Sequence, residues 1–402
     1  MDDAARDGNS VEKSTQRIHK LRRQLVGLAR YDATIARIRP IYNNACVTGN
    51  YSQHRRLRHG RLAAACVVTL CILVVPGPSE AQTTPARCRY VQLARLPITY
   101  TRQQPIIEGT INGTPVKMLL DTGAQQTVLT RNLVEKLGLT LSHSSRLAMG
   151  ISGVSTQYRA HVDSVSIGPI HENHLNLMVA WETANLPVGA LVGADFLFQR
   201  DIEISLSSRE IKFFEAFERS ACSEAFLAYW DPDAAVVDLA MGPTRDRRPT
   251  FSVEVNGHKL RAIIDSGAQV SAIDLAAAAR AGITPQTPGV VAIRAMGGIG
   301  AHRAASWIAP IDSFLIGGET IRNTSIVISD LQGSALADSK NMRTADFLRE
   351  QAEMLLGADF LQAHRVLVAL SQMRLYFSYL GGGVFRAQTG SEGTPDPPRA
   401  TP

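Results

Sequence analysis

Two stretches of the chain alternate apolar and polar residues on both sides of an Asn-Gly pair, and both stretches end in an acid. Residues 105–125 read PIIEGTINGTPVKMLLDTGAQ and residues 249–269 read PTFSVEVNGHKLRAIIDSGAQ, and the two align without a gap. Alternation is typical of a half-buried β-strand, and Asn-Gly between two such runs favours a two-residue hairpin turn. Each stretch is therefore predicted to form two strands around a tight turn, the second strand ending at Asp121 or Asp265.

The two stretches open a longer internal repeat, which indicates one structural unit used twice. Four further segments recur in the same order: RLAMGISG with IRAMGGIG, SVSIGPI with SFLIGGE, LVGADFL with LLGADFL, and IEISLSSREIKFF with VLVALSQMRLYFS. Strand patterns dominate, and the helices we expect follow the acid motifs and the GADFL segments. We predict an all-β pair of lobes over residues 90–216 and 234–379, a linker over 217–233, and a Gly/Pro-rich disordered tail over 381–402.

The basic residues of the chain are concentrated before the repeat. The formal net charge is +6, but residues 1–81 hold 13 Lys or Arg and 6 Asp or Glu, whereas the remaining residues hold 29 and 30. The repeat region therefore has no electrostatic footprint of a nucleic-acid-binding protein. We expect no nucleic-acid partner.

This basic leader has the order of a secretory signal. Four arginines precede the apolar run LAAACVVTLCILVV at residues 62–75, and a small-x-small site ends at Ala81. The run is shorter than the about 20 residues that span a membrane, but an uncleaved signal-anchor remains the alternative. The long stretch before the run is unusual, so a later start, at Val47 if its codon is GTG, is a further hypothesis. We expect a periplasmic or extracellular protein whose only membrane contact is a possible anchor at residues 62–75.

The cysteines and histidines give little sign of a metal site. Cleavage after Ala81 would leave only Cys88 and Cys222 of the five cysteines, which in an exported protein predicts one disulfide. The ten histidines show no ligand spacing, and we interpret His171 and His174 as a solvated loop pair. We expect no metal and no cofactor.

The acid at the end of each predicted strand is unusual, because removing a carboxylate from water is costly. Its recurrence at the same place in both repeats indicates that two carboxylates are needed at one site. A lone Asp-Thr-Gly or Asp-Ser-Gly is weak evidence, but each copy here carries its own hairpin, its own Gly-rich tip and its own aliphatic-Gly segment in the same order. Together they are a specific signal.

In these residues the chain resembles the retropepsin-like aspartic peptidases. The shared pattern is Asp-Thr/Ser-Gly-Ala after aliphatic residues, then a Gly-rich flap, then two aliphatics and a glycine, in both repeats. The resemblance implies two retropepsin-like β-barrel lobes on one chain in a bilobal, pepsin-like architecture. It also implies an endopeptidase that works as a monomer without a metal or cofactor.

The resemblance assigns the chemistry to Asp121 and Asp265. Hydrolysis by water needs a base that takes a proton from the water and an acid that protonates the carbonyl oxygen. Two adjacent carboxylates do not both ionise cheaply, so they share one proton and supply both roles. No covalent intermediate is required.

The residues after each acid would support it. Thr122 and Ser266 would donate hydroxyl hydrogen bonds to the opposite lobe, with Ser266 in place of the commoner threonine. Gly123 and Gly267 would let the backbone turn tightly, so that its N–H groups reach the carboxylates.

The two Gly-rich hairpin tips would act as flaps that close over an extended peptide or protein substrate. The residues expected in the flaps are Gly150, Ile151, Ser152 and Gly153 in the first repeat, and Gly297, Gly298, Ile299 and Gly300 in the second.

Two positions depart from the retroviral pattern. Ala194 and Ala358 stand where retroviral members have an arginine, so that contact between lobes is absent. The following acids, Asp195 and Asp359, are predicted to cap or hydrogen-bond locally rather than to act in catalysis.

Two other functions stay open. A peptide-binding or scaffolding module could keep the fold without turnover, although both acids are retained. A membrane-tethered processing protease differs from an exported endopeptidase only in the leader.

Overall fold

The computed structural model describes residues 87–101, 103–150, 153–180, 187–217, 219–242, 246–297, 303–331 and 351–385. The leader, with its predicted signal, its alternative anchor and its start site, lies outside these residues. Within them, no helix is both long and apolar enough to cross a membrane.

The described residues of the first repeat form eleven strands and two short helices. They are β1 (Arg89–Pro97), β2 (Thr99–Thr101), β3 (Gln104–Ile111), β4 (Thr114–Leu120), β5 (Val128–Thr130), α2 (Arg131–Leu137), β6 (Leu141–Gly150), β7 (Gly153–Ile167), β8 (Ile170–Ala180), β9 (Ala190–Val192), α3 (Ala194–Leu197), β10 (Asp201–Ser205) and β11 (Glu210–Phe217).

The second repeat has the same order of elements, and helix α4 (Arg219–Cys222) lies between the repeats. Its elements are β12 (Ala235–Asp238), β13 (Ala240–Met241), β14 (Pro249–Val255), β15 (His258–Ile264), β16 (Ala272–Asp274), α5 (Leu275–Arg280), β17 (Val291–Met296), β18 (Ala304–Ile316), β19 (Glu319–Ser329), β20 (Met354–Leu356), α8 (Ala358–Ala363), β21 (His364–Ala369) and β22 (Arg374–Tyr379).

Both predicted hairpins form, and their turns have the expected geometry. Strand β3 pairs antiparallel with β4, and β14 pairs with β15. Asn112 and Gly113 have φ of 49° and 74°, and Asn256 and Gly257 have φ of 48° and 78°. Positive φ at both turn residues matches the right-handed twist of the flanking strands, which is why Asn-Gly is favoured there.

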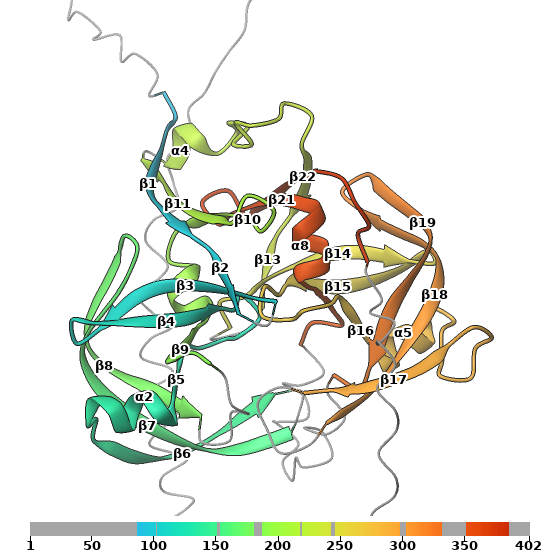
Figure 1. The fold of residues 1–402 in the computed structure, drawn as a ribbon. Coiled ribbons are helices and arrows are strands. Elements are labelled where there is room, and N and C mark those ends of the chain that lie inside the picture. Colours follow the sequence, from blue (N-terminus) through green and yellow to red (C-terminus); the bar gives the residue numbers. More distant parts are fainter. Residues whose placement is uncertain are drawn as a thin grey trace, which may run out of the picture. The chain divides into compact units, whose positions relative to one another are not determined.

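Each repeat closes into a barrel. The first sheet has the order β2-β3-β4-β9-β5-β8-β7-β6, and an additional pairing of β3 with β7 closes the strands from β3 to β7 into a barrel. The second sheet repeats this plan with β13-β14-β15-β20-β16-β19-β18-β17 and a pairing of β14 with β18. In Figure 1 the strands of the first sheet run from blue to green and those of the second from yellow to red. The prediction of an all-β, bilobal acid-protease fold is confirmed.

A third sheet joins the two repeats, which the sequence pattern does not predict. Its order is β1-β11-β10-β21-β22-β12, and β10 of the first repeat pairs with β21 of the second. The alternation in this region indicates only two separate strand pairs, one for each lobe. The residues between the repeats pack on the same sheet, where Leu227 and Ala228 are buried against Phe214 and Tyr376.

The start of the disordered tail, predicted at residue 381, is placed too early in the chain. Residues 381–385 are ordered against the second lobe, and Val384 and Phe385 belong to the hydrophobic core. The Phe385 ring packs edge to face on Phe314, with centroids 5.1 Å apart. The prediction of disorder from residue 381 is therefore wrong for these five residues, because two apolar side chains after the glycines suffice to anchor them. Residues 386–402 lie outside the described part of the chain.

Candidate active site

The two acids lie at equivalent ends of buried strands. Asp121 follows β4, which runs parallel to β9, and its N–H donates to the carbonyl of Val192 at 3.1 Å. Asp265 follows β15, which runs parallel to β20, and its N–H donates to the carbonyl of Leu356 at 2.9 Å. In each barrel the parallel strand pair thus ends just before an acid. The two barrels therefore place one carboxyl each at equivalent strand ends.

Hydroxyl groups lock the two acid motifs together. Thr122 Oγ1 donates to the carbonyl of Ile264 at 2.8 Å, and Ser266 Oγ donates to the carbonyl of Leu120 at 2.8 Å. The N–H of each residue donates to the other's hydroxyl, at 3.1 Å from Thr122 and 3.0 Å from Ser266. Both side chains are fully buried. These four hydrogen bonds fix the separation of the strands that carry Asp121 and Asp265.

The glycines of the two motifs are needed for a reason beyond the N–H contacts that we predicted. Neither Gly123 nor Gly267 has a positive φ. A Cβ at Gly123 would lie 2.2 Å from Cγ of Asp265, and a Cβ at Gly267 would lie 2.3 Å from Cγ of Asp121. Each glycine is therefore required because the carboxyl of the opposite lobe packs directly against it.

Backbone N–H groups hold both carboxyls in matching positions. Asp121 Oδ1 accepts from the N–H groups of Gly123 at 3.0 Å and Ala124 at 2.9 Å. Asp265 Oδ1 accepts from the N–H groups of Gly267 and Ala268, both at 3.0 Å. One oxygen of each carboxyl is thereby occupied, and both residues keep part of their surface accessible. The second oxygen of each carboxyl has no backbone donor among these contacts.

Burial raises the pKa of both carboxyls, and the charged groups around them differ. Burial raises the pKa of Asp121 well above its ordinary value, and the negative charge of Asp265 raises it further. Burial also raises the pKa of Asp265, but the N–H of Ala268 and the positive charge of Arg248 oppose that rise. Burial and the closeness of the two groups therefore disfavour a state in which both carboxyls are ionised, and Arg248 is a positive charge that acts on the Asp265 side of the pair.

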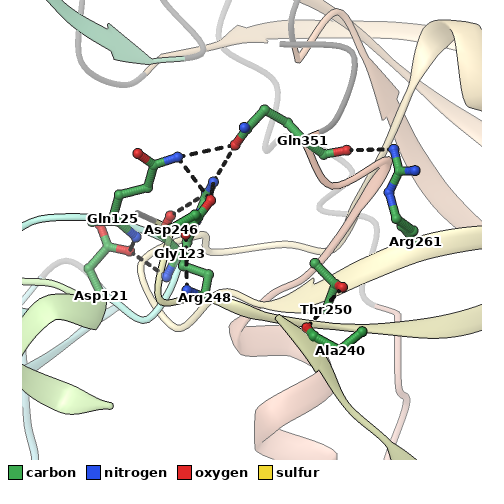
Figure 2. Close-up of polar contacts among 10 residues, drawn as sticks. Asp121, Gly123, Gln125, Ala240, Asp246, Arg248, Thr250, Arg261 and Gln351 are labelled. Atoms are coloured by element: carbon green, nitrogen blue, oxygen red, sulfur yellow. Dashed lines mark hydrogen bonds and ion pairs between the residues drawn. The ribbon is translucent and has the colours of Figure 1, made fainter. Parts of the chain in front are cut away.

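Arg248 is a site residue that we did not predict from the sequence. It precedes β14 of the second repeat, yet its Nη1 donates to the carbonyl of Gly123 in the first, at 2.8 Å (Figure 2). Asp246 orients the guanidinium, with an Nη2–Oδ2 distance of 2.6 Å. Gln125 donates to Asp246 at 3.0 Å and to Gln351 at 3.2 Å. An Arg-Pro before a predicted strand carries no local sign of such a contact, so only the packing of the repeats reveals it.

The acids of the two GADFL segments are structural, as we predicted. Asp195 Oδ1 accepts from the N–H and the hydroxyl of Thr127, both at 2.8 Å. Asp359 Oδ1 accepts in the same way from Ser271, at 2.8 Å from the N–H and 2.6 Å from the hydroxyl. Each acid thus holds the loop between the acid motif and the following strand. Each also accepts from a first-turn N–H of its own helix, at 3.0 Å from Phe196 to Asp195 and 2.8 Å from Phe360 to Asp359.

The flap residues are described only in part. Gly150 ends β6 and Gly153 begins β7, and the two are paired, so a hairpin closes there. Gly297 follows β17 and is exposed. The other flap residues, Ile151, Ser152, Gly298, Ile299 and Gly300, lie outside the described residues.

Cys88 and Cys222 are joined by a disulfide in the structure, with their Cα atoms 4.5 Å apart. The bridge ties the residue before β1 to α4 and so brackets the first repeat. Cys222 is buried.

Comparison with known proteins finds one family model for each repeat. A model described as gag-polyprotein putative aspartyl protease matches residues 107–199, and a model described as aspartyl protease matches residues 251–360. The two matches are in tandem, and each includes one of the acid motifs.

The chain is also similar to a relative and to solved structures of other proteins. DNA damage-inducible protein 1 of Kluyveromyces lactis is 30% identical over 105 residues, which is 25% of this chain and 24% of that protein. The chain therefore spans about a quarter of that relative's length. The aspartic proteinase from Irpex lacteus aligns with 72% of this chain and 97% of its own, at 14% identity and a TM-score of 0.42.

Proposed function

Because the chain belongs to the retropepsin-like aspartic peptidase family, we propose that it is an endopeptidase whose Asp121 and Asp265 activate a water molecule. The observation that carries the proposal is the approach of the two carboxyls across the repeat boundary, each against the glycine of the opposite motif. Two neighbouring carboxyls do not both ionise cheaply, so in this proposal they share one proton, and one is an acid while the other is a base.

We assign the acid to Asp121 and the base to Asp265. Arg248 lies beside Gly123, which packs on the Asp265 carboxyl, and its charge favours the ionised form of Asp265. In the hydrolytic step Asp265 takes a proton from water while the proton on Asp121 passes to the carbonyl oxygen of the substrate. The C–N bond of the resulting tetrahedral intermediate then breaks: the amine takes the proton that Asp265 received from water, and one hydroxyl of the intermediate returns a proton to Asp121 as the carbonyl re-forms.

The residues around the dyad would serve this step by holding the geometry. Thr122 and Ser266 keep the two acid motifs in register, and the N–H groups of Gly123 and Gly267 orient one oxygen of each carboxyl. The flaps would cover an extended peptide and pair with its backbone.

The test is hydrolysis of a peptide library by the purified full chain. We expect cleavage products that a pepstatin-type inhibitor suppresses. The Asp121→Asn variant should fold and give no products. Binding of peptides without cleavage under all conditions, by a folded wild-type protein, would instead support the silent peptide-binding module.

The compartment and the oligomeric state are part of the same proposal. We propose that the protein is exported to the periplasm or the extracellular space, because the leader has the order of a secretory signal. We also propose an active monomer, because both acids are on one chain. Specific activity should not fall on dilution, whereas a steep loss would indicate that two chains build the site.

A further inference from the structure

A second group of chemistry-bearing side chains lies on the first lobe, on neighbouring strands β7 and β8. It consists of His161, Asp163 and His174, whose ligand atoms all lie within 4.8 Å of one another. His161 Nε2 is 3.7 Å from Asp163 Oδ1, and the rings of His161 and His174 are nearly parallel, with centroids 6.2 Å apart. All three side chains are exposed.

The backbone presents these side chains at an interruption of the strand pairing. In the register of β7 and β8, Asp163 stands opposite His174, between the pairs Val162–Leu175 and Ser164–Asn173. His174 has a φ of 52°, which a strand does not adopt and which interrupts the pairing. The N–H of Asp163 donates to Asn112 Oδ1 at 2.8 Å, so the Asp163 backbone is held from the β3–β4 turn.

The second lobe has the same backbone feature without the same side chains. Asp312 stands opposite Asn323 between β18 and β19, Asn323 has a φ of 51°, and the N–H of Asp312 donates to Asn256 Oδ1 at 2.9 Å. The residue equivalent to His161 is Pro310. The fold therefore requires the interruption but not the two histidines, and only the first lobe combines it with two imidazoles and a carboxylate.

We propose that His161, Asp163 and His174 bind a divalent transition-metal ion such as Zn²⁺. Two imidazole nitrogens and one carboxylate oxygen are a ligand set that Zn²⁺ takes. Three protein ligands on an exposed surface leave at least one coordination position for water. The ion would link β7 to β8 at the point where their pairing is interrupted.

The site would be separate from the acid dyad. Asn112, which holds Asp163, lies at the turn of the β3–β4 hairpin, whereas Asp121 follows the other end of β4. A seven-residue strand at about 3.3 Å per residue spans roughly 20 Å. The ion would therefore stabilise the first lobe rather than take part in hydrolysis.

The first measurement is a calorimetric titration of chelator-treated full chain with ZnCl₂. We expect one more Zn²⁺ per chain in the wild type than in the double variant His161→Ala, His174→Asn. Asparagine is chosen at 174 because Asn323 adopts the same φ in the second lobe. Each single variant should weaken binding by at least about tenfold. Addition of Zn²⁺ should raise the unfolding temperature of the wild type but not that of the double variant.

His171→Ala is the matched control. His171 is an exposed histidine of β8 whose Nδ1 lies 2.9 Å from Ser166 Oγ, and it is not part of the group. This variant should bind Zn²⁺ as the wild type does. Equal Zn²⁺ stoichiometry in the wild type and the folded double variant would overturn the proposal.

A gain of binding provides the second test. The exposed pair Pro310→His and Asn323→His would place two imidazoles beside Asp312 in the second lobe, at the same backbone geometry. The variant should bind one more Zn²⁺ per chain than the wild type. When Co²⁺ replaces Zn²⁺, the variant should also show a set of absorption bands in addition to those of the wild type. No gain, in a variant that unfolds at the wild-type temperature, would contradict the proposed geometry.

Discussion

Replacement of Thr122 by valine tests the hydroxyl contacts that join the two acid motifs. Valine has nearly the shape of threonine but has no hydroxyl, so the change removes polar contacts without leaving a large cavity. The Thr122 hydroxyl donates to the carbonyl of Ile264 and accepts from the N–H of Ser266, and the side chain is fully buried. In the variant both backbone groups lose a partner where water cannot replace it.

The magnitude follows from these two groups. An unsatisfied buried donor or acceptor destabilises a fold by about 1–3 kcal/mol, so the two together should lower the free energy of unfolding by about 2–6 kcal/mol. Burial of the additional methyl group of valine should raise the free energy of unfolding by less than about 1 kcal/mol. The net loss of about 1–5 kcal/mol is a large part of the free energy of unfolding of a typical folded domain, which is roughly 5–15 kcal/mol.

Urea denaturation followed by circular dichroism measures this loss, and Thr122→Ser is the matched control. Serine keeps both hydrogen bonds and loses one methyl group, which should lower the free energy of unfolding by about 1 kcal/mol. Ser266→Ala removes the mirror-image contact with Leu120. Because the two hydroxyls also contact each other's backbone, the double variant should show non-additive losses.

Two results would refute the reasoning. One is a Thr122→Val protein within about 1 kcal/mol of the wild type, which is less than the loss of a single buried partner. The other is a Thr122→Ser protein as unstable as Thr122→Val, which would assign the effect to the methyl group rather than to the hydroxyl.

Four further predictions concern the dyad and the disulfide. Asp121→Asn should abolish hydrolysis. Because the pKa of Asp121 is raised in the folded protein, the free energy of unfolding of the wild type should fall as pH rises from the ordinary aspartate pKa of about 3.9 through the raised value. The variant should lose less stability over this range, and equal losses in urea denaturation at several pH values would contradict the burial argument. Arg248→Met should raise the Asp265 pKa and shift the acidic limb of the activity profile to higher pH, whereas the exposed neighbour Arg247→Met should leave that limb in place. The double variant Ala124→Ser, Ala268→Ser should add a hydroxyl donor beside each carboxyl, favour the ionised forms and so move the basic limb of the pH–rate profile toward lower pH. An unmoved limb would show that these hydroxyls do not reach the carboxyls. Replacing Cys88 and Cys222 by alanine opens a loop of 134 residues and should lower the free energy of unfolding by about 4–5 kcal/mol in the chain-entropy model, so a change below about 1 kcal/mol in urea denaturation would oppose that model for this protein.

The sequence by itself determined the local elements and the identity of the acid motifs. Strand alternation and the Asn-Gly pairs predicted both hairpins, because the period of two and the positive φ of a two-residue turn are local properties. The duplication of the acid motif predicted two lobes with one carboxyl each. These features need no knowledge of which distant segments meet.

The tertiary structure decided how the two copies combine. The pairing of β10 with β21, the contact of Arg248 with Gly123 and the packing of each glycine on the opposite carboxyl all join residues more than 100 positions apart. The alternation of a strand shows which face is buried but not which strand lies beside it. Long-range pairing depends on the whole set of barrel registers, so a local pattern cannot specify it.

The same distinction applies to His161, Asp163 and His174. Their spacing along the chain shows no ligand motif, and the sequence alone favours a solvated pair of His171 with His174. Only the register of β7 against β8 places His174 opposite Asp163 and beside His161. The sequence determines which side chains are available, and the pairing of strands decides which of them share a surface.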